Sequence, residues 1–342
     1  YQGKYPPEKN LFRYALFVSF FPAIVTGPIE QGDHLLPQLK APRPFDYDRC
    51  AGGLFRMLWG YVKTMVIAEA VSPYVRQVYS HPADYAGPYL AAAAVLFSLY
   101  LYMNFSGCCD LAIGSARILG YDLLENFESP FLAPTFRELW RRWHMSLTGW
   151  FRRYLYVPLG GSRKGLFRHC MNLLLVFLFS GLWHGADWGY LWWGLASGLL
   201  SVAGLLFDKA LKRPKNPQPL PLPLRILQVL RTYLLFSLVF VFFACALYGS
   251  SPAVMFAGMF KGWSGALPGL ASGFVAAGLD AASARVALIG AAFVFACEAL
   301  GNVSQWVRKL PFLVRWPLYY LLCLSILFFG AFGQSAYIYQ QY

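Results

Sequence analysis

Charged side chains are scarce in this sequence, and acidic ones are the scarcest. Of the 342 residues, 13% are charged, with 16 Asp and Glu against 29 Lys and Arg. A soluble globular domain carries about a quarter charged residues and close to half apolar ones. Here 58% of the residues are hydrophobic and 18% are aromatic. This balance excludes an ordinary soluble domain and indicates a protein that lies in a lipid bilayer.

Several chemical motifs are absent as well. The seven cysteines form no CxxC pair and show no metal-ligand spacing, so the sequence predicts no metal site. It contains neither the GxSxG motif of serine hydrolases nor the GxxxxGK[ST] loop that holds nucleotide phosphates. Most of the cysteines lie in apolar segments, where cysteine packs as a small hydrophobe. The adjacent Cys108 and Cys109 leave a second interpretation open, a covalent acyl carrier.

Long apolar runs are what the sequence has instead. Runs of about 16–22 residues can cross roughly 30 Å of hydrocarbon as helices, and their continuity argues against barrel strands, which alternate. Pro22, Gly27 and Pro28 favour a broken or re-entrant segment in place of the first span. We predict an all-α, polytopic transmembrane helix bundle with interfacial and re-entrant helices, in one domain over residues 1–342. The expected spans are 11–29, 54–72, 89–107, 171–187, 189–207, 228–248, 284–301 and 317–334.

The basic residues gather between these runs, which is typical of cytoplasmic loops. This clustering explains the net charge of +13 without a nucleic-acid partner. It places loops 137–168, 208–227 and 302–316 in the cytoplasm and loops 73–88 and 249–283 outside, with the bilayer as the surrounding partner. Within these loops, the proline-rich residues 212–225 predict a connector without regular structure. Residues 250–283 predict a long outer loop with short interfacial helices.

Segment 136–154, "FRELWRRWHMSLTGWFRRY", carries too many arginines for a span. At about 100° per residue, its large apolar side chains share one helical stripe. The pattern predicts one amphipathic helix at the membrane boundary, with tryptophans at headgroup depth. His144 falls at the border of the stripe, where a histidine ordinarily bonds a headgroup or a carbonyl. The stripe comprises Phe136, Trp140, Trp143, Leu147, Phe151 and Tyr154.

The next segment, "PLGGSRKG" at 158–165, combines a glycine turn with basic side chains. The first interpretation of Arg163, Lys164 and Arg168 is that they anchor a cytoplasmic loop. The alternative is that they contact the phosphates of an acyl donor through charge-assisted hydrogen bonds.

A single histidine stands in the apolar and aromatic stretch "GLWHGADWGYLWWG", residues 181–194. An ionisable group at membrane depth is by default a candidate functional residue. His184 has the small Ser180 and Gly181 one turn earlier, which predicts space beside its ring. An imidazole with a pKa near 6.5 suits general-base chemistry at neutral pH. A histidine bonded to a neighbouring carbonyl is the alternative.

Three stretches together resemble the membrane-bound O-acyltransferase family: "NFSGCCDLAIGSARILGYDLLENFESPF", "RELWRRWHMSLTGWFRRYLYVPLGGSRKG" and "SGLWHGADWGYLWWG". The likeness is greatest to the bacterial branch of alginate O-acetyltransferase and the teichoic-acid D-alanylation protein. Residues 17–31 and 332–342 also look like that branch. The resemblance implies that spans precede Tyr1 in the natural protein. Asn104, Cys108 and Asp187 depart from the usual family pattern, and Asp187 receives no family role.

The resemblance implies acyl transfer at a membrane-embedded histidine, His184, with His144 as the second histidine of the bacterial branch. His184 is expected to act as base, and His144 to position the thioester or stabilise its oxyanion. The donor is expected to be acetyl-CoA or another acyl thioester, and no permanently bound cofactor is expected. Both histidines are expected to line one cavity open to both faces of the membrane. The candidate substrate-binding residues are Ser180, Gly181, Trp183, Arg141 and Trp143.

The expected acceptor is a hydroxyl of an exported polysaccharide or a periplasmic acyl-relay protein, served from the bacterial inner membrane. One alternative is D-alanyl transfer to teichoic acid from an acyl-carrier protein. A transporter or channel is another, and it would show buried charges strung along several spans. A non-catalytic membrane scaffold is the third. The expected spans contain few such charges beyond Lys63, Glu69 and Glu298.

Overall fold

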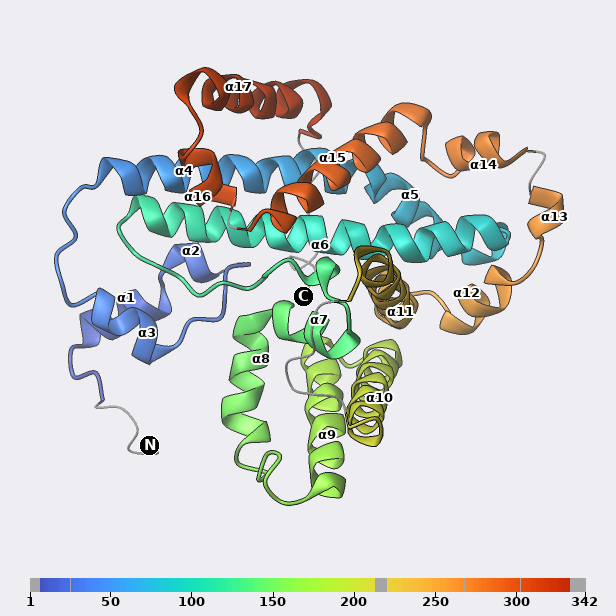
Figure 1. The fold of residues 1–342 in the computed structure, drawn as a ribbon, viewed down its shortest axis with the longest axis horizontal. Helices are drawn as coiled ribbons and strands as arrows, with labels where there is room; N and C mark the ends of the chain where they lie inside the picture. Colours follow the sequence, from blue (N-terminus) through green and yellow to red (C-terminus); the bar gives the residue numbers. More distant parts are fainter. Residues whose placement is uncertain (1–6, 25, 213–219, 267–268, 302, 333–342) are drawn as a thin grey trace. The chain divides into compact units, whose positions relative to one another are not determined.

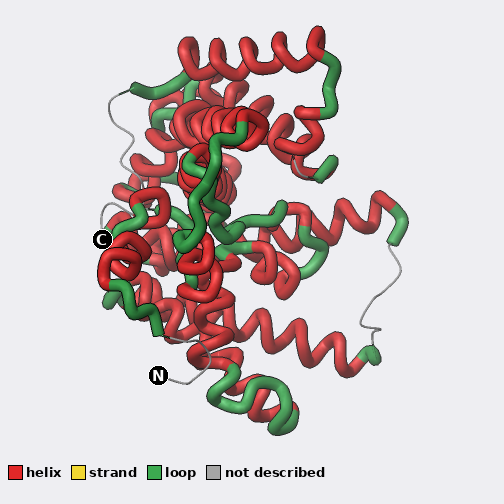
Figure 2. Tube along the Cα trace, turned by 90° about the vertical axis from the view of Figure 1, so that its left-hand side faces the viewer, coloured by secondary structure: helices red, strands yellow, loops and turns green. Residues whose placement is uncertain are grey.

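The computed structural model describes residues 7–24, 26–212, 220–266, 269–301 and 303–332. Helices and loops make up these residues, and no strand occurs among them (Figures 1 and 2). Labels with η denote 3₁₀ and π helices. The elements are α1 Leu11–Val18, α2 Phe21–Ile24, α3 Gly32–Gln38, α4 Tyr47–Tyr61, η1 Val62–Ala68, α5 Glu69–Ser80, η2 Pro82–Asp84, α6 Gly87–Ile118, η3 Pro130–Leu132, α7 Phe136–Arg142, α8 Met145–Phe151, η4 Arg152–Tyr156, α9 Leu166–His184, α10 Trp188–Ala210, α11 Leu222–Tyr248, α12 Pro252–Met259, α13 Trp263–Ala266, α14 Leu270–Ala276, α15 Ala281–Ala299, α16 Val303–Arg308 and α17 Phe312–Phe329.

Six helices in the described part of the chain are long and apolar enough to cross a membrane. They are α6, α9, α10, α11, α15 and α17. Each coincides with an expected span, so the predicted all-helical class is confirmed. The short helices predicted within 250–283 are present as well, because its described residues include α12, α13 and α14.

The first two expected spans have a different form. Residues 11–29 break into α1 and α2, as Pro22, Gly27 and Pro28 suggest, and a Cβ on Gly27 would lie 2.5 Å from the carbonyl oxygen of Pro22. Residues 54–72 lie within a helical run over α4, η1 and α5, whose middle part is a π-helix. Such π segments are rare and often accompany functional sites.

The prediction of an irregular connector over 212–225 is partly wrong. Helix α11 begins at Leu222, inside that segment, with Pro221 as its N-cap and Pro223 in its first turn. Proline is tolerated there because the first N–H groups of a helix have no intrahelical acceptor. Composition alone therefore placed the start of this helix too late.

Contacts divide the chain into two compact units, which we describe separately. Unit 1 comprises residues 1–69, 102–128 and 290–342, and unit 2 comprises residues 70–101 and 129–289. In unit 1 the broken N-terminal segment packs through Phe20 and Leu35 against Ile113 of α6. In unit 2 the two apolar helices α9 and α10 run side by side (Figure 1).

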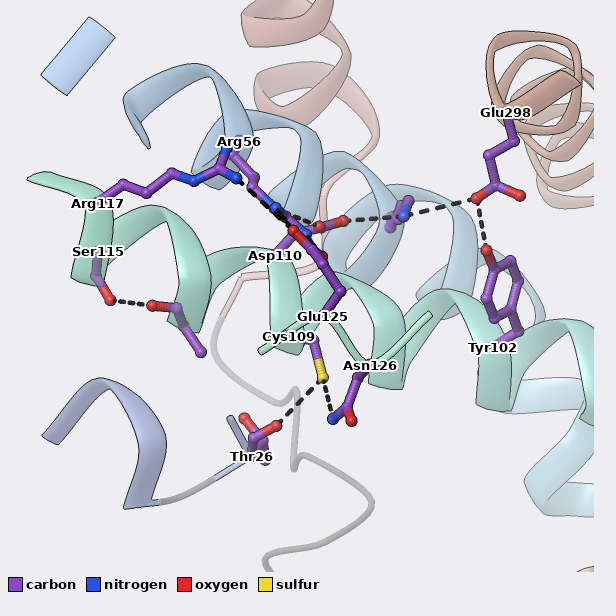
Figure 3. A network of polar contacts seen from close by, with 12 residues as sticks. Thr26, Arg56, Tyr102, Cys109, Asp110, Ser115, Arg117, Glu125, Asn126 and Glu298 are labelled. Carbon is purple, nitrogen blue, oxygen red and sulfur yellow. Dashed lines mark hydrogen bonds and ion pairs between the residues drawn. The ribbon is translucent and has the colours of Figure 1, made fainter. Parts of the chain in front are cut away.

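Unit 1 holds a chain of charged side chains from α4, η1, α6 and α15 (Figure 3). Lys63 is buried, and its Nζ donates to Asp110 Oδ2 at 2.9 Å. Arg56 Nε donates to the other oxygen of Asp110 at 2.9 Å, and the Arg56 guanidinium also pairs with Glu125. Lys63 Nζ lies 3.8 Å from Glu298 Oε1, which accepts a 2.6 Å hydrogen bond from the Tyr102 hydroxyl. The network thus ties one end of α15 to α6.

The arrangement of this network argues against the transporter alternative. Lys63 and Glu298 are far apart in sequence, yet in the folded protein Lys63 pairs with Glu298 as well as with Asp110. A charged group inside hydrocarbon is costly unless it is paired, and here each of these three side chains faces an opposite charge. The buried charges therefore form one paired cluster within unit 1, unlike the charges strung along several spans that a transporter would show.

Cys108 and Cys109 lie within this part of α6, and both are buried. The Cys109 thiol donates to the carbonyl oxygen of Thr26 at 3.4 Å and accepts from Asn126 Nδ2 at 3.2 Å. An acyl carrier needs a thiol that can meet its substrate. Burial and these two hydrogen bonds favour the packing interpretation of the pair.

We expect Lys63→Met to lower the free energy of unfolding by about 3–5 kcal/mol, because it leaves the buried carboxylate of Asp110 short of a partner. Thermal unfolding of the protein in detergent measures the loss. Arg308→Met is the matched control, because it breaks an exposed pair with Asp48, at 3.1 Å, whose contribution is expected to be about 0–1 kcal/mol. Equal losses in the two variants would contradict a stabilising role for the buried network.

Candidate functional site

His184 is the last residue of α9, and its side chain is buried, with 8% of the residue exposed. Aromatic rings from three helices surround it. Its ring centroid lies 4.9 Å from that of Trp183, 5.2 Å from Trp193 and 5.1 Å from Phe243. Tyr190 is the fourth ring, at 6.4 Å. The histidine therefore lies in an aromatic enclosure built by α9, α10 and α11.

Close packing of α9 and α10 builds one wall of this enclosure. A Cβ on Gly194 would lie 2.5 Å from the carbonyl oxygen of Phe177, and a Cβ on Gly181 would collide with the carbonyl of Tyr190. The space predicted beside Gly181 is therefore filled by the α10 backbone, and the glycine serves this contact. Asp187 is the N-cap of α10, because its Oδ1 accepts from the N–H of Gly189 at 2.7 Å. This cap supplies the role that the sequence left unassigned.

His144 lies at a break in the segment that was predicted as one helix over residues 136–154. That prediction is wrong, because α7 ends at Arg142 and α8 begins at Met145. Between them, His144 has a left-handed backbone with φ of +44°. Such a conformation in a non-glycine residue costs of order 1–3 kcal/mol and clusters at functional sites. The break turns the imidazole inward, and His144 is only 7% exposed.

The fold brings the two histidines to the same place. The ring of Trp183 lies 6.3 Å from that of His144 and 4.9 Å from that of His184. Burial lowers the pKa of His144, and the nearby His184 lowers it further. A lowered pKa keeps the His144 ring neutral at neutral pH, so it has one N–H donor and one acceptor nitrogen. The site thus offers two neighbouring imidazoles in a setting poor in water.

Most of the predicted aromatic stripe packs inside unit 2, although the helix is broken, and Tyr154 is the exposed exception. Trp143 is buried, and its ring centroid lies 4.9 Å from that of Phe236. Trp140 lies 5.2 Å from Phe177 and 5.7 Å from Trp193. These two residues therefore form part of an aromatic core, and their expected depth in the membrane stays a prediction.

The other sequence candidates lie in different surroundings. Ser180 is buried one turn before His184, and Trp183 is about half exposed beside it. The Arg141 side chain is exposed. The side chains of the basic cluster are exposed as well. Asn172 stabilises the turn that carries this cluster, because its Nδ2 donates to the carbonyl oxygen of Gly161 at 2.9 Å. The basic cluster comprises Arg163, Lys164 and Arg168.

Two residues of the site were missed by the sequence analysis. Trp193 and Phe243 contact the His184 ring, but they lie on α10 and α11. Trp193 could have been found, because it follows Tyr190 by three residues on the same face of a helix. Phe243 is one of many phenylalanines in an apolar span, and no local signal distinguishes it.

The chain is similar to several bacterial envelope enzymes. The probable alginate O-acetylase AlgI of Pseudomonas putida is 36% identical over 219 residues, which cover 64% of this chain and 44% of that protein. The peptidoglycan O-acetyltransferase of Helicobacter pylori is 35% identical over 232 residues, covering 67% and 43%. The teichoic acid D-alanyltransferase of Bacillus subtilis is 29% identical over 224 residues, covering 62% and 56%. The chain spans about half the length of the curated relatives it matches.

The family profile of MBOAT, the membrane-bound O-acyltransferase family, matches residues 7–245. This region contains both histidines and every ring that surrounds His184. It confirms the resemblance noted in the sequence, although residues 333–342 of the C-terminal resemblance lie outside the described residues. With its six apolar helices, the protein is a multi-pass membrane protein. The chain belongs to the membrane-bound O-acyltransferase family.

Proposed function

We propose that the protein is an O-acyltransferase of the bacterial inner membrane. It moves an acyl group, acetyl in the first place, from a cytoplasmic thioester such as acetyl-CoA to a hydroxyl of an exported polysaccharide or of a relay partner. The observation that carries the proposal is the convergence of His144 and His184, two buried imidazoles from separate segments of the chain, on the ring of Trp183. An acetyl group is favoured because two of the named relatives act in O-acetylation by name.

The two histidines have separate roles in this reaction. A hydroxyl is a weak nucleophile until a base removes its proton during attack. His184 takes that proton while the hydroxyl oxygen bonds to the thioester carbonyl carbon. The carbon–sulfur bond then breaks, and the proton on His184 passes to the departing thiolate. His144, neutral and close by, positions the thioester.

The rings around His184 have a chemical purpose in this scheme. Water would hydrolyse an activated thioester, and a site lined by Trp193 and Phe243 leaves little room for it. The buried setting also strengthens every hydrogen bond to the developing charge. The cavity open to both faces, expected from the family, is part of this proposal.

The acetyl content of the envelope polysaccharide, with and without the full-length protein, tests the proposed function. Loss of acetyl esters on deletion, restored by the gene, supports it. Unchanged acetyl esters with loss of D-alanine esters would assign the protein to teichoic acid instead. No change in any acyl ester would contradict an acyltransferase.

His184→Ala is expected to reduce transfer by about 10²–10⁴-fold, because the attack then lacks its base. The readout is polymer acylation at matched protein levels in the membrane. His169→Ala is the control, since it makes the same change near the opposite end of α9, beside Tyr156. Full acylation by a normally expressed His184→Ala variant would remove His184 from the mechanism.

If both histidines act on one step, the double variant His144→Ala with His184→Ala should transfer little more slowly than the worse single variant. Initial rates of the four proteins, measured with the same thioester, give the coupling. Unfolding temperatures are measured alongside, because His144 has a strained backbone. Rate losses that multiply would show that the two residues act independently.

The basic cluster is expected to act chiefly as a topology anchor. Replacing Arg163, Lys164 or Arg168 singly by Gln should therefore change activity little, because an exposed charge in water interacts weakly. Steady-state kinetics with varied acyl donor measure the effect. A large rise in the KM for the donor in any of the three variants would instead demonstrate phosphate recognition.

A further inference from the structure

The indole N–H of Trp193 is buried and has no hydrogen-bond acceptor in the structure as described. Trp193 lies on α10 and is 2% exposed. A buried tryptophan ordinarily directs its N–H to a partner, because an unpaired donor away from water costs about 1–3 kcal/mol. This cost is borne at a position beside the candidate base, where an acceptor on a bound substrate would remove it.

The surroundings of Trp193 are aromatic. Its ring centroid lies 5.5 Å from Phe240, 5.4 Å from Phe243 and 5.7 Å from Trp140. A phenylalanine would suit such neighbours without burying a donor. The fourth neighbour is His184, whose ring stands almost perpendicular to the indole, at 89° and 5.2 Å between centroids. A ligand atom placed against His184 therefore also lies within the neighbourhood of the indole.

An oxygen that is present only when substrate is bound would supply the acceptor. The acyl carbonyl oxygen meets this requirement, because the carbon attacked under the control of His184 carries it. During attack this oxygen gains negative charge, and fixed N–H donors in a dry site stabilise that charge most effectively. An indole N–H is only a donor, so its direction of donation is the same at every pH.

We propose that the Trp193 indole N–H donates a hydrogen bond to the carbonyl oxygen of the acyl thioester and stabilises the oxyanion of the tetrahedral intermediate. This assignment rests on the proposed acyl transfer. The bond to the hydroxyl oxygen forms, the carbonyl π electrons move onto the oxygen that Trp193 holds, and they return as the thiolate leaves. His144 keeps the task of positioning the thioester.

The test replaces Trp193 by 3-benzothienylalanine, an isostere in which sulfur takes the place of the N–H, in the full-length protein. We expect kcat to fall by about 10²–10³-fold with little change in the KM for acetyl-CoA, the usual effect of losing one oxyanion donor. The unfolding temperature without substrate should not fall, because the lost donor had no partner. Trp193→Phe is the second variant, with a smaller ring.

The matched control is the same isostere at Trp192, the preceding residue, which is 51% exposed. Its kcat should equal that of the unchanged protein. A second readout needs no turnover: the infrared carbonyl band of bound acetyl-CoA labelled with ¹³C at the acyl carbon. Loss of the hydrogen bond should move this band to higher frequency in the Trp193 isostere only.

The two possible failures are distinguishable. Normal kcat and an unmoved carbonyl band in the Trp193 isostere, beside an active unchanged protein, overturn this assignment and leave the proposed function intact. A lower unfolding temperature with an unmoved band also overturns it, since it indicates a structural role. An unchanged protein that neither binds acetyl-CoA nor transfers its acetyl group contradicts both.

Discussion

A backbone group or a charged side chain inside hydrocarbon is costly unless it finds a partner within the protein, and this constraint shapes both units of the structure. The helices satisfy it for the backbone, since each N–H and C=O within a span bonds along its own helix. The charged side chains satisfy it by meeting one another. Lys63 faces two carboxylates, Asp110 and Glu298, and Arg56 balances the charge that remains on Asp110. The buried charged side chains are tolerated here because each of them pairs with an opposite charge.

The same requirement affects the protonation state of the histidines in the candidate site. His144 and His184 are titratable, yet both are buried among aromatic rings. Burial favours the neutral ring, and a neutral imidazole is the form that can accept a proton. The buried setting that makes a charged imidazole costly in hydrocarbon thus keeps the His144 ring neutral. Trp183 and Trp193 complete it with flat, rigid surfaces.

Much of this could be predicted from local pattern. Apolar runs identify the six long helices, and one histidine in an aromatic span identifies His184. Residues that meet only through the fold could not be found in this way. Phe243 joins the site from a distant helix, and Lys63 meets Glu298 across the length of the sequence.

Backbone irregularities were the other source of error. A helical wheel assumes a regular helix, so it could not reveal the left-handed backbone of His144 or the π-helix that begins at Val62. The start of α11 was misjudged for the opposite reason, because Pro221 and Pro223 suggest a loop but fit a helix N-terminus.

The glycine contacts between α9 and α10 have a consequence for motion. Carbonyl groups of one helix occupy the places where side chains of the other would stand, at Gly181 and at Gly194. Where two helices touch through their backbones in this way, no layer of side chains separates them, so they cannot easily slide or move apart. Any opening that admits a substrate to His184 is therefore expected to leave α9 and α10 together.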